Sequence, residues 1–349
     1  MPENIIAFKD VAVEFTKDKK TIHFDPENSA EMNYKKYKEN FDTNGFKEWI
    51  NKIREGEKLA KESGKYQGPY IYQNYLRYGA GAINIISFFN TGTYSYDEYN
   101  LIFPVRTYDA PRMPGVVDVA SGLGESKHLH WEMQREGIEE TIVTHNSEAK
   151  GIRIAVPEFA AYNSLSIFNK PILEKVKEVS KALNLGGEIT FVSTPTFPIE
   201  LPGSWTVEVK GEVPPNTNFP AVISFESNSV ELIVGRLTLI PADIQPSDVK
   251  FRDTEVDERN NMLLNRKSLE INIQTGEIKV YQGGEILLNG KLADFLKTID
   301  LSKTGDVYAT GKVATFINNV FSDEESIKRQ IPLLRRIDPS LKELVRGYY

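Results

Sequence analysis

The sequence predicts an α/β fold in which helices pack on the faces of a mixed sheet. Between residues 82 and 250, strand-like runs bounded by proline, glycine or asparagine outnumber helical segments. Two helical segments, one within 117–143 and one beginning at Pro171, lie between groups of these strands. A chain of 349 residues with 40% apolar content can bury the core that such a fold requires.

Residues 1–78 are predicted to form an N-terminal extension that contains a hairpin and a helix. Apolar runs along residues 1–25 are interrupted at Lys17–Lys20, which is typical of a hairpin. In Gly45–Ser63, apolar residues recur at helical spacing, namely Phe46, Trp49, Ile50 and Ile53. Gly64 and the pair Gly68-Pro69 are expected to end this helix.

Residues 79–242 are predicted to form the main α/β domain, and residues 243–349 a smaller C-terminal unit. The strand-like runs of the main domain are AINIISFF, NLIFPVRTY, GVVDVAS, GIRIAVPEF, EITFVS, WTVEVKG, AVISFES and VELIVGRLTLIP. In 268–290, apolar and polar residues alternate around the turns QTGE and QGGE, which predicts a three-stranded meander. Residues 291–299 and 311–345 are expected to form a helical tail.

Composition and missing motifs exclude several classes of function. Without cysteine, the chain has no disulfide, no thiolate-held zinc or iron–sulfur cluster and no cysteine nucleophile, and it fits a reducing cytoplasm. The net charge of −7 gives no general basic footprint, so nucleic acid is not the expected partner. No run reaches the roughly 18 apolar residues of a membrane helix, and no signal peptide is recognisable. Serine-hydrolase, P-loop and Rossmann motifs are also missing.

The segment Val117–Val143, VDVASGLGESKHLHWEMQREGIEETIV, passes from an apolar strand through two glycines into an acidic helix. At about 100° per residue, Trp131, Ile138 and Ile142 form a narrow stripe that we expect to be buried. Four carboxylates gather on another side, from Glu132, Glu136, Glu139 and Glu140. Such a cluster is usually a solvated face. The preceding glycine loop and the nearby Arg135 favour the alternative, a site for a hard divalent cation.

The run Arg135-Glu136-Gly137-Ile138-Glu139-Glu140-Thr141 resembles the second half of the Nudix box. This strand–loop–helix signature belongs to hydrolases of nucleoside diphosphates linked to another moiety. NLIFPVRTYDA followed by PGVVDVASGLGE is similar to the strand, arginine and Pro-Gly entry that precede the box. The resemblance covers residues 80–160, and more loosely 65–240. It implies a Nudix-like α/β/α sandwich with a mixed sheet, to which the N-terminal extension and the C-terminal meander with its helical tail are added.

The resemblance also implies a set of site residues. Mg²⁺ or Mn²⁺ would be bound by Glu136, Glu139 and Glu140, with Glu125 and Glu132 as supplementary ligands. Glu136 or Glu139 would act as general base, Arg135 would orient the carboxylates, and Arg106 would contact phosphate or ribose. The predicted activity is divalent-metal-dependent hydrolysis of a nucleotide-like small molecule.

Four positions depart from the family pattern. The glutamate expected eight residues before Arg135 is replaced by Lys127, and the leading glycine of the box falls on Ser121. A two-residue insertion at the junction of loop and helix accounts for both changes. Gly137 and Ile142 replace an aliphatic residue and a glycine of the box. An alternative therefore stays open: a catalytically inactive Nudix-like protein that binds a ligand or assembles, for example as a homo-oligomer.

Two further signals have ordinary structural interpretations. His128 and His130 form an H-x-H pair that we interpret as loop residues rather than zinc ligands, because no third ligand is near in sequence. The tyrosines between Tyr66 and Tyr78 are interpreted as strand packing, with stacking on a nucleotide base as the alternative.

Overall fold

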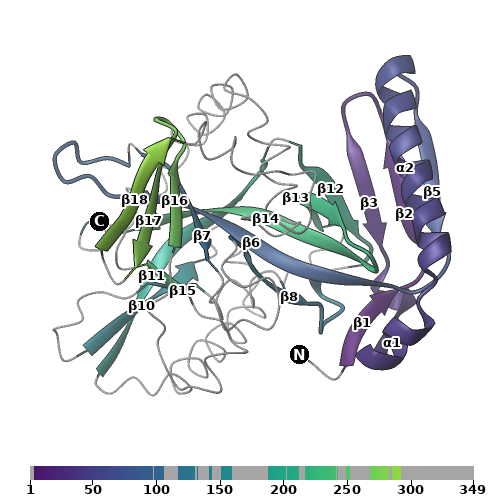
Figure 1. Ribbon diagram of the computed structural model, residues 1–349, viewed down its shortest axis with the longest axis horizontal. Coiled ribbons are helices and arrows are strands. Elements are labelled where there is room, and N and C mark those ends of the chain that lie inside the picture. Colours follow the sequence, from purple (N-terminus) through teal and green to yellow (C-terminus); the bar gives the residue numbers. More distant parts are fainter. Residues whose placement is uncertain are drawn as a thin grey trace. The chain divides into compact units, whose positions relative to one another are not determined.

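The computed structural model describes residues 4–96, 98–105, 117–129, 132, 141–143, 151–158, 188–201, 203–211, 217–240, 242, 249–251, 268–282 and 285–291. These residues form a mixed α/β fold in which strands predominate (Figure 1). Contacts divide the chain into two compact units. The first unit comprises Met1–Ala82, Ser121–Glu136 and Pro198–Gly235, and the second unit comprises Ile83–Ala120, Gly137–Phe197 and Arg236–Tyr349.

The first unit contains the N-terminal strands and helices. Its elements are β1 (Asn4–Phe8), β2 (Val11–Phe15), β3 (Lys20–Phe24), the 3₁₀ turn η1 (Pro26–Asn28), β4 (Ser29–Asn33), α1 (Tyr34–Asn40), α2 (Thr43–Ser63), β5 (Gln67–Tyr72), most of β8 (Ala120–Leu123), β12 (Trp205–Val209) and β13 (Thr217–Phe225). Strands β2 and β3 pair antiparallel with Phe15 opposite Lys20, so the predicted hairpin is confirmed.

Helix α2 confirms the predicted N-terminal helix. It starts after Asp42, whose carboxylate accepts a hydrogen bond from Gly45 N at 2.9 Å. Its apolar residues are buried, namely Phe46, Trp49, Ile50, Ile53 and Ala60. It ends at Gly64, which adopts a left-handed conformation (φ 68°) and donates its N–H to Ala60 O.

The sheet of the first unit is mixed, because β3 and β12 pair in parallel whereas β2–β3, β2–β5 and β12–β13 are antiparallel. Helix α2 lies alongside β5 and β2 (Figure 1). The core cluster combines side chains from this helix with strand residues that include Phe8, Phe15, Tyr78 and Trp205. The rings of Phe8 and Tyr78 meet edge to face, with centroids 5.6 Å apart.

The second unit contains the remaining short strands. They are β7 (Asn100–Pro104), β9 (Thr141–Val143), β10 (Gly151–Glu158), most of β11 (Glu188–Ile199), β15 (Val249–Phe251), β16 (Ser268–Asn272), β17 (Glu277–Gln282) and β18 (Glu285–Lys291). Strands β16, β17 and β18 form the predicted meander. Strand β16 also pairs with β7, so contacts group the meander with residues of the predicted main domain. The boundary near residue 243 stays a prediction.

Two long strands, β6 (Leu76–Phe88) and β14 (Ser229–Ile240), continue from the first unit into the second. In the first unit their core residues occupy even positions, namely Leu76, Tyr78, Ala80, Ala82, Val230, Leu232 and Val234. In the second unit the buried polar residues Asn84, Arg236 and Thr238 occupy even positions, as do Ile86 and Ile240, whereas Ile83, Ile85, Leu237 and Leu239 are buried at odd positions.

One element differs from its prediction. The expectation that Ile142 lies on the buried stripe of the acidic helix is wrong, because Ile142 belongs to β9 and pairs with Lys250 of β15. Thr141, Ile142 and Val143 are all β-branched, which favours a strand. Trp131, Ile138 and the helices expected in 171–187, 291–299 and 311–345 lie outside the described residues, except Lys291, which is the last residue of β18. In the part of the chain that is described, no helix is both long and apolar enough to cross a membrane.

Candidate functional site

The entry to the predicted box lies next to β6 in the first unit. After β8, Gly124 donates its N–H to Tyr78 O at 3.0 Å and accepts at its carbonyl from Ile6 N at 2.9 Å. The Tyr78 hydroxyl donates to Ser126 O. A Cβ atom on residue 124 would lie 2.2 Å from Cε1 and Cζ of the Tyr78 ring. Packing therefore requires glycine at position 124.

A helical turn follows this glycine loop. Glu132 N donates to His128 O at 3.2 Å, and Leu129 is fully buried in the core cluster. The Glu132 side chain is only 1% exposed and makes further interactions within the protein. Glu125, in contrast, is exposed. Of the two supplementary ligands, only Glu132 is thus held inside the protein, where a carboxylate needs a polar or charged partner.

The principal predicted site residues lie outside the described residues, namely Arg106, Arg135, Glu136, Glu139 and Glu140. Within the described ranges, no group of three histidine, aspartate or glutamate side chains is arranged to hold a metal ion. The described carboxylates of the box region, Glu125 and Glu132, do not form a metal site by themselves. The Mg²⁺ or Mn²⁺ site stays a prediction that depends on the three box glutamates.

The structure also describes several of the tyrosines between Tyr66 and Tyr78 and one histidine of the H-x-H pair. Tyr72 and Tyr78 are buried in the core, so the packing interpretation of the tyrosine run is confirmed for these two. Tyr66 is exposed and donates its hydroxyl to Glu14 at 2.8 Å. Partial burial, followed by the charge of Lys127, lowers the pKa of His128. His130 lies outside the described residues.

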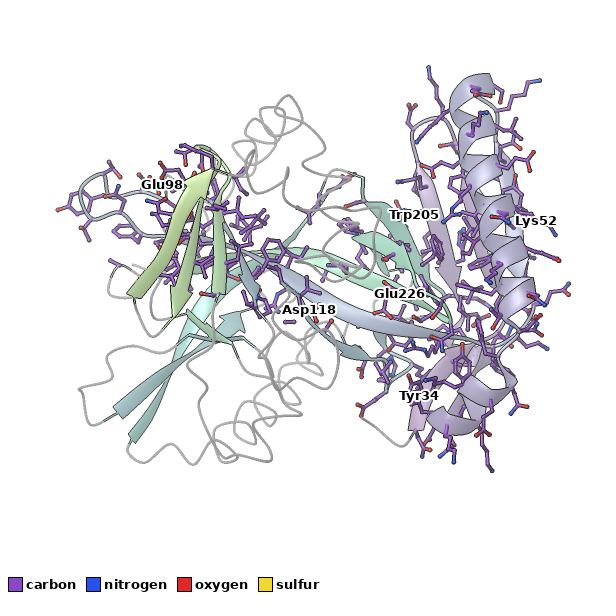
Figure 2. The ribbon with its side chains drawn as sticks, in the orientation of Figure 1. Tyr34, Lys52, Glu98, Asp118, Trp205 and Glu226 are labelled. Atoms are coloured by element: carbon purple, nitrogen blue, oxygen red, sulfur yellow. The ribbon has the colours of Figure 1, made fainter. Side chains whose placement is uncertain are left out.

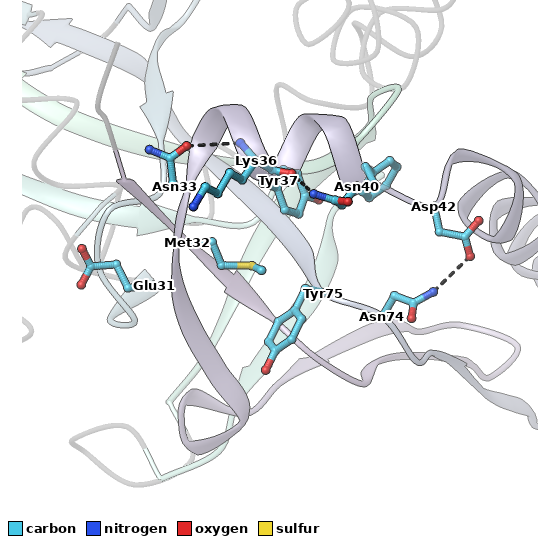
Figure 3. Close-up of a pocket in the computed structure, with 10 residues that line it drawn as sticks. Glu31, Met32, Asn33, Lys36, Tyr37, Asn40, Asp42, Asn74 and Tyr75 are labelled. Carbon is cyan, nitrogen blue, oxygen red and sulfur yellow. Dashed lines mark hydrogen bonds between the residues drawn. The ribbon is translucent and has the colours of Figure 1, made fainter.

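A pocket of about 400 Å³ lies beside α1 in the first unit (Figure 3). Its polar side chains hold the local fold together. Asn33 accepts from Lys36 N and caps α1, whereas Asp42 caps α2 and accepts from the Asn74 amide at 3.1 Å. The Tyr37 hydroxyl donates to Asn228 O and accepts from Arg77 N, and burial raises its pKa. Caps and turn contacts account for this composition without a ligand.

A second cluster of polar residues lies on one face of the sheet in the second unit. Paired residues across antiparallel strands share a face, and Asn84, Ile102, Glu270 and Lys279 form one such row across β6, β7, β16 and β17. We call this surface the polar face. Its buried polar members are Asn84, Asn100, Ser268, Glu270 and Asn272. The opposite face carries apolar residues that include Ile85, Leu101 and Ile271.

Glu270 lies at the centre of the polar face. Its side chain is 5% exposed, and its Oε2 atom has no hydrogen-bond partner. Desolvation is the main cause that raises the pKa of Glu270, and the hydroxyl of Tyr281, which hydrogen-bonds the carboxyl group, opposes the shift. Nearby, Asn272 donates to the carboxylate of Glu98 at 3.3 Å. Figure 2 labels Glu98. Glu98 also raises the pKa of Glu270.

Arg236 of β14, in the second unit, is a charged residue that burial strongly desolvates. It is 4% exposed, and its Nε atom has no hydrogen-bond partner. Neither Arg236 nor Glu270 is among the site residues predicted from the sequence. A signal was present, because Arg236 interrupts the run VELIVGRLTLI, in which most residues are apolar.

Comparison of the chain with protein-family models, with curated proteins and with solved structures gave no match. The function of the protein is therefore inferred from the residues of this chain alone.

Proposed function

We propose that the protein is a divalent-metal-dependent hydrolase whose substrate is a nucleoside diphosphate linked to another moiety. The observation that supports the proposal most is the order of elements in 120–132. A strand, a loop with a packing-required glycine and a helical turn follow one another directly before the run REGIEE. This is the order in which the Nudix box presents its glutamates.

The buried Glu132 gives further support. If the helical turn that joins Glu132 N to His128 O continues, Glu136 follows one turn later on the same side as Glu132. Glu139 and Glu140 then follow after one more turn. Carboxylate oxygens are the ligands that Mg²⁺ and Mn²⁺ prefer, so the donor set fits these ions.

In this proposal each residue has a defined task. Glu136, Glu139 and Glu140 would hold the ion, and the chemistry that it would supply is neutralisation of charge on the phosphoryl oxygens. Glu136 or Glu139 accepts the proton of the attacking water, and Arg135 orients these carboxylates through its opposite charge. Arg106 binds a phosphate or the ribose of the substrate.

The test begins with metal binding. We expect millimolar MgCl₂ or MnCl₂ to raise the midpoint of thermal unfolding saturably, at ionic strength matched with NaCl, because only the folded chain presents the site. Glu139→Gln should abolish this rise. Glu55→Gln is the matched control, since Glu55 is an exposed glutamate of α2 and should leave the response unchanged.

Turnover is measured next, with a panel of nucleoside diphosphate derivatives and release of phosphorylated product as the readout. Hydrolysis that Glu139→Gln removes supports the enzyme. A metal response without hydrolysis of any substrate favours the alternative, a Nudix-like binding or assembly protein. Lys127 and Gly137, which replace residues of the family pattern, favour this alternative. If the wild-type chain shows no metal response, both forms of the proposal fall.

We also propose that the protein works in the cytoplasm and, in the alternative form of a binding or assembly protein, forms a homo-oligomer. A chain without cysteine fits a reducing compartment. Light scattering coupled to size-exclusion chromatography tests self-association, since a mass near 39.5 kDa would identify a monomer.

A further inference from the structure

Arg236 of β14 presents an unusual combination of charge and burial. Its side chain is 4% exposed, and no ion pair joins it to any carboxylate among the described residues. The Nε atom lacks a hydrogen-bond partner. Desolvation lowers the pKa of Arg236 to about 10, so the guanidinium is still charged at neutral pH.

A buried charge without a partner is costly, and proteins ordinarily pair such a group with an opposite charge. The expected partner of Arg236 is therefore an anion. It is either a carboxylate of this chain beyond the described residues or an anionic group supplied by a ligand. These two possibilities predict opposite effects when the arginine is removed.

The neighbours of Arg236 are hydrogen-bonding groups. Strands β6 and β14 are neighbours, and Phe89 N donates to Ile240 O at 3.0 Å in the second unit. Gly79 of β6 also lies against the Glu231 side chain of β14, so residue numbers rise in the same direction along both strands. Counting back from Phe89 and Ile240 then places Asn84 beside Arg236. Thr238, two residues further along β14, shares the face of Arg236 and is 8% exposed.

The row that contains Asn84 continues across the polar face to Ile102 and Glu270. The guanidinium of Arg236 thus lies beside Asn84, at one end of this row. The carboxyl group of Glu270 lies two strands away from Asn84, on β16. Both groups are buried, and each has one polar atom without a hydrogen-bond partner. This arrangement matches a ligand that carries oxyanions at one end.

We propose that Arg236 binds a phosphoryl group of a ligand at the polar face, with Asn84 and Thr238 beside it as neutral hydrogen-bonding groups. The guanidinium offers a planar fork of N–H donors that binds phosphate oxygens in pairs. A tetrahedral phosphoryl group has further oxygens for the amide and the hydroxyl. A carboxylate has only two oxygens and satisfies the fork alone. This inference goes beyond the proposed function, because it uses none of the box residues.

Thermal unfolding of the full chain tests the proposal with sodium pyrophosphate, at ionic strength matched with NaCl and without divalent metal. We expect a saturable rise of the unfolding midpoint for the wild-type chain. Sodium phosphate should act at higher concentration, since it offers fewer oxygens. Sodium citrate is the carboxylate arm and should have no saturable effect. A wild-type chain that responds to neither phosphate nor pyrophosphate, or equally to citrate, overturns the proposal.

Variants locate the effect. Arg236→Met removes the charge at similar length, and we expect it to unfold at a higher temperature than the wild type without ligand and to lose the pyrophosphate response. Arg54→Met is the matched control, because Arg54 is exposed on α2, and it should respond like the wild type. A strong loss of stability in Arg236→Met without ligand identifies an internal carboxylate partner and overturns the proposal.

Arg236→Lys tests the geometry of the guanidinium group separately from its charge. Lysine keeps the positive charge but loses the planar fork. We expect its pyrophosphate affinity, measured by isothermal titration, to fall at least tenfold relative to the wild type. Equal affinity of Arg236→Lys and wild type would show that the fork takes no part in binding and would overturn the proposal. The outcome is independent of the Mg²⁺ response, so failure of this site and failure of the box proposal are distinguishable.

Discussion

Gly124 and Tyr78 are in direct contact, with the space for a Cβ atom on residue 124 filled by the tyrosine ring. The Tyr78 side chain is fully buried, so the ring has no free space to move into. The same two residues are joined by a backbone hydrogen bond of 3.0 Å from Gly124 N to Tyr78 O. The loop that enters the predicted box is thereby fixed to β6.

We therefore expect Gly124→Ala to lower the free energy of unfolding by about 1–3 kcal/mol, the usual cost of overpacking a core. Urea unfolding followed by circular dichroism measures this change. Gly290→Ala is the control, because its Cβ atom would meet Ile278 at an ordinary 3.5 Å. That variant should change stability by less than about 1 kcal/mol, in the stabilising direction. Equal stabilities of Gly124→Ala and Gly290→Ala would contradict the contact.

Gly56 of α2 is a milder case of the same contact. Alanine usually stabilises a helix interior by about 1 kcal/mol relative to glycine. Here the added Cβ atom would lie 2.4 Å from Cε2 of Tyr70. Tyr70 is only half-buried, so its ring can move aside at a smaller cost than that of Tyr78.

We expect Gly56→Ala to be destabilising, by less than Gly124→Ala. In a Tyr70→Ala background the same substitution should become stabilising by up to about 1 kcal/mol, because only the helix propensity is left. A double-mutant cycle of unfolding free energies measures this reversal. A substitution that stabilises the chain in both backgrounds would refute the clash.

Local patterns predicted much of the fold. The β2–β3 hairpin, helix α2 and the meander β16–β18 were predicted from alternation, helical spacing and glycine turns within short segments. Strand β9 was missed because it has three residues and pairs with Val249–Phe251, which is distant in sequence. A helix pattern that continues through Ile142 conceals such a short strand.

The two candidate sites also differ in whether their residues are close together in the sequence. The box was recognisable because its residues are consecutive, although its glutamates lie outside the described residues. The polar face was not recognisable, since Asn84, Arg236 and Glu270 come from three distant segments that only strand pairing brings together.

Glu270 should make stability depend on pH. Its pKa is raised in the folded chain, mainly by burial, while Lys279 and Tyr281 oppose the shift and Glu98 adds to it. The folded state therefore holds the proton more tightly than the unfolded state. The stabilising contribution is complete below the ordinary pKa of 4.5 and is lost as pH rises through the raised folded value.

Glu270→Gln removes this titration and retains the shape. We expect its free energy of unfolding to exceed that of the wild type increasingly as pH rises from 4.5 towards neutrality. Urea unfolding at a series of pH values measures the difference. Glu277→Gln is the control, since Glu277 lies in the same meander in a weak exposed pair with Lys291. A constant difference between Glu270→Gln and wild type across this range would show that burial does not perturb the carboxyl group.

The pairing of β16 with β7 decides whether the C-terminal unit is separable. Ser268–Asn272 lies antiparallel to Asn100–Pro104 over five residue pairs. A chain that ends at Pro241 loses this pairing, which leaves the apolar strand NLIFP with an unpaired edge and removes the buried Leu269 and Ile271 from its sheet. We expect the shortened chain to aggregate, or to unfold without a cooperative transition, when solubility and thermal unfolding are compared with the full chain.

A chain ending at Lys291, which retains the meander, is the matched control and should be more soluble than the one ending at Pro241. A soluble, cooperatively folded chain ending at Pro241 would instead support a domain boundary near residue 243 and would show that β7 does not require β16.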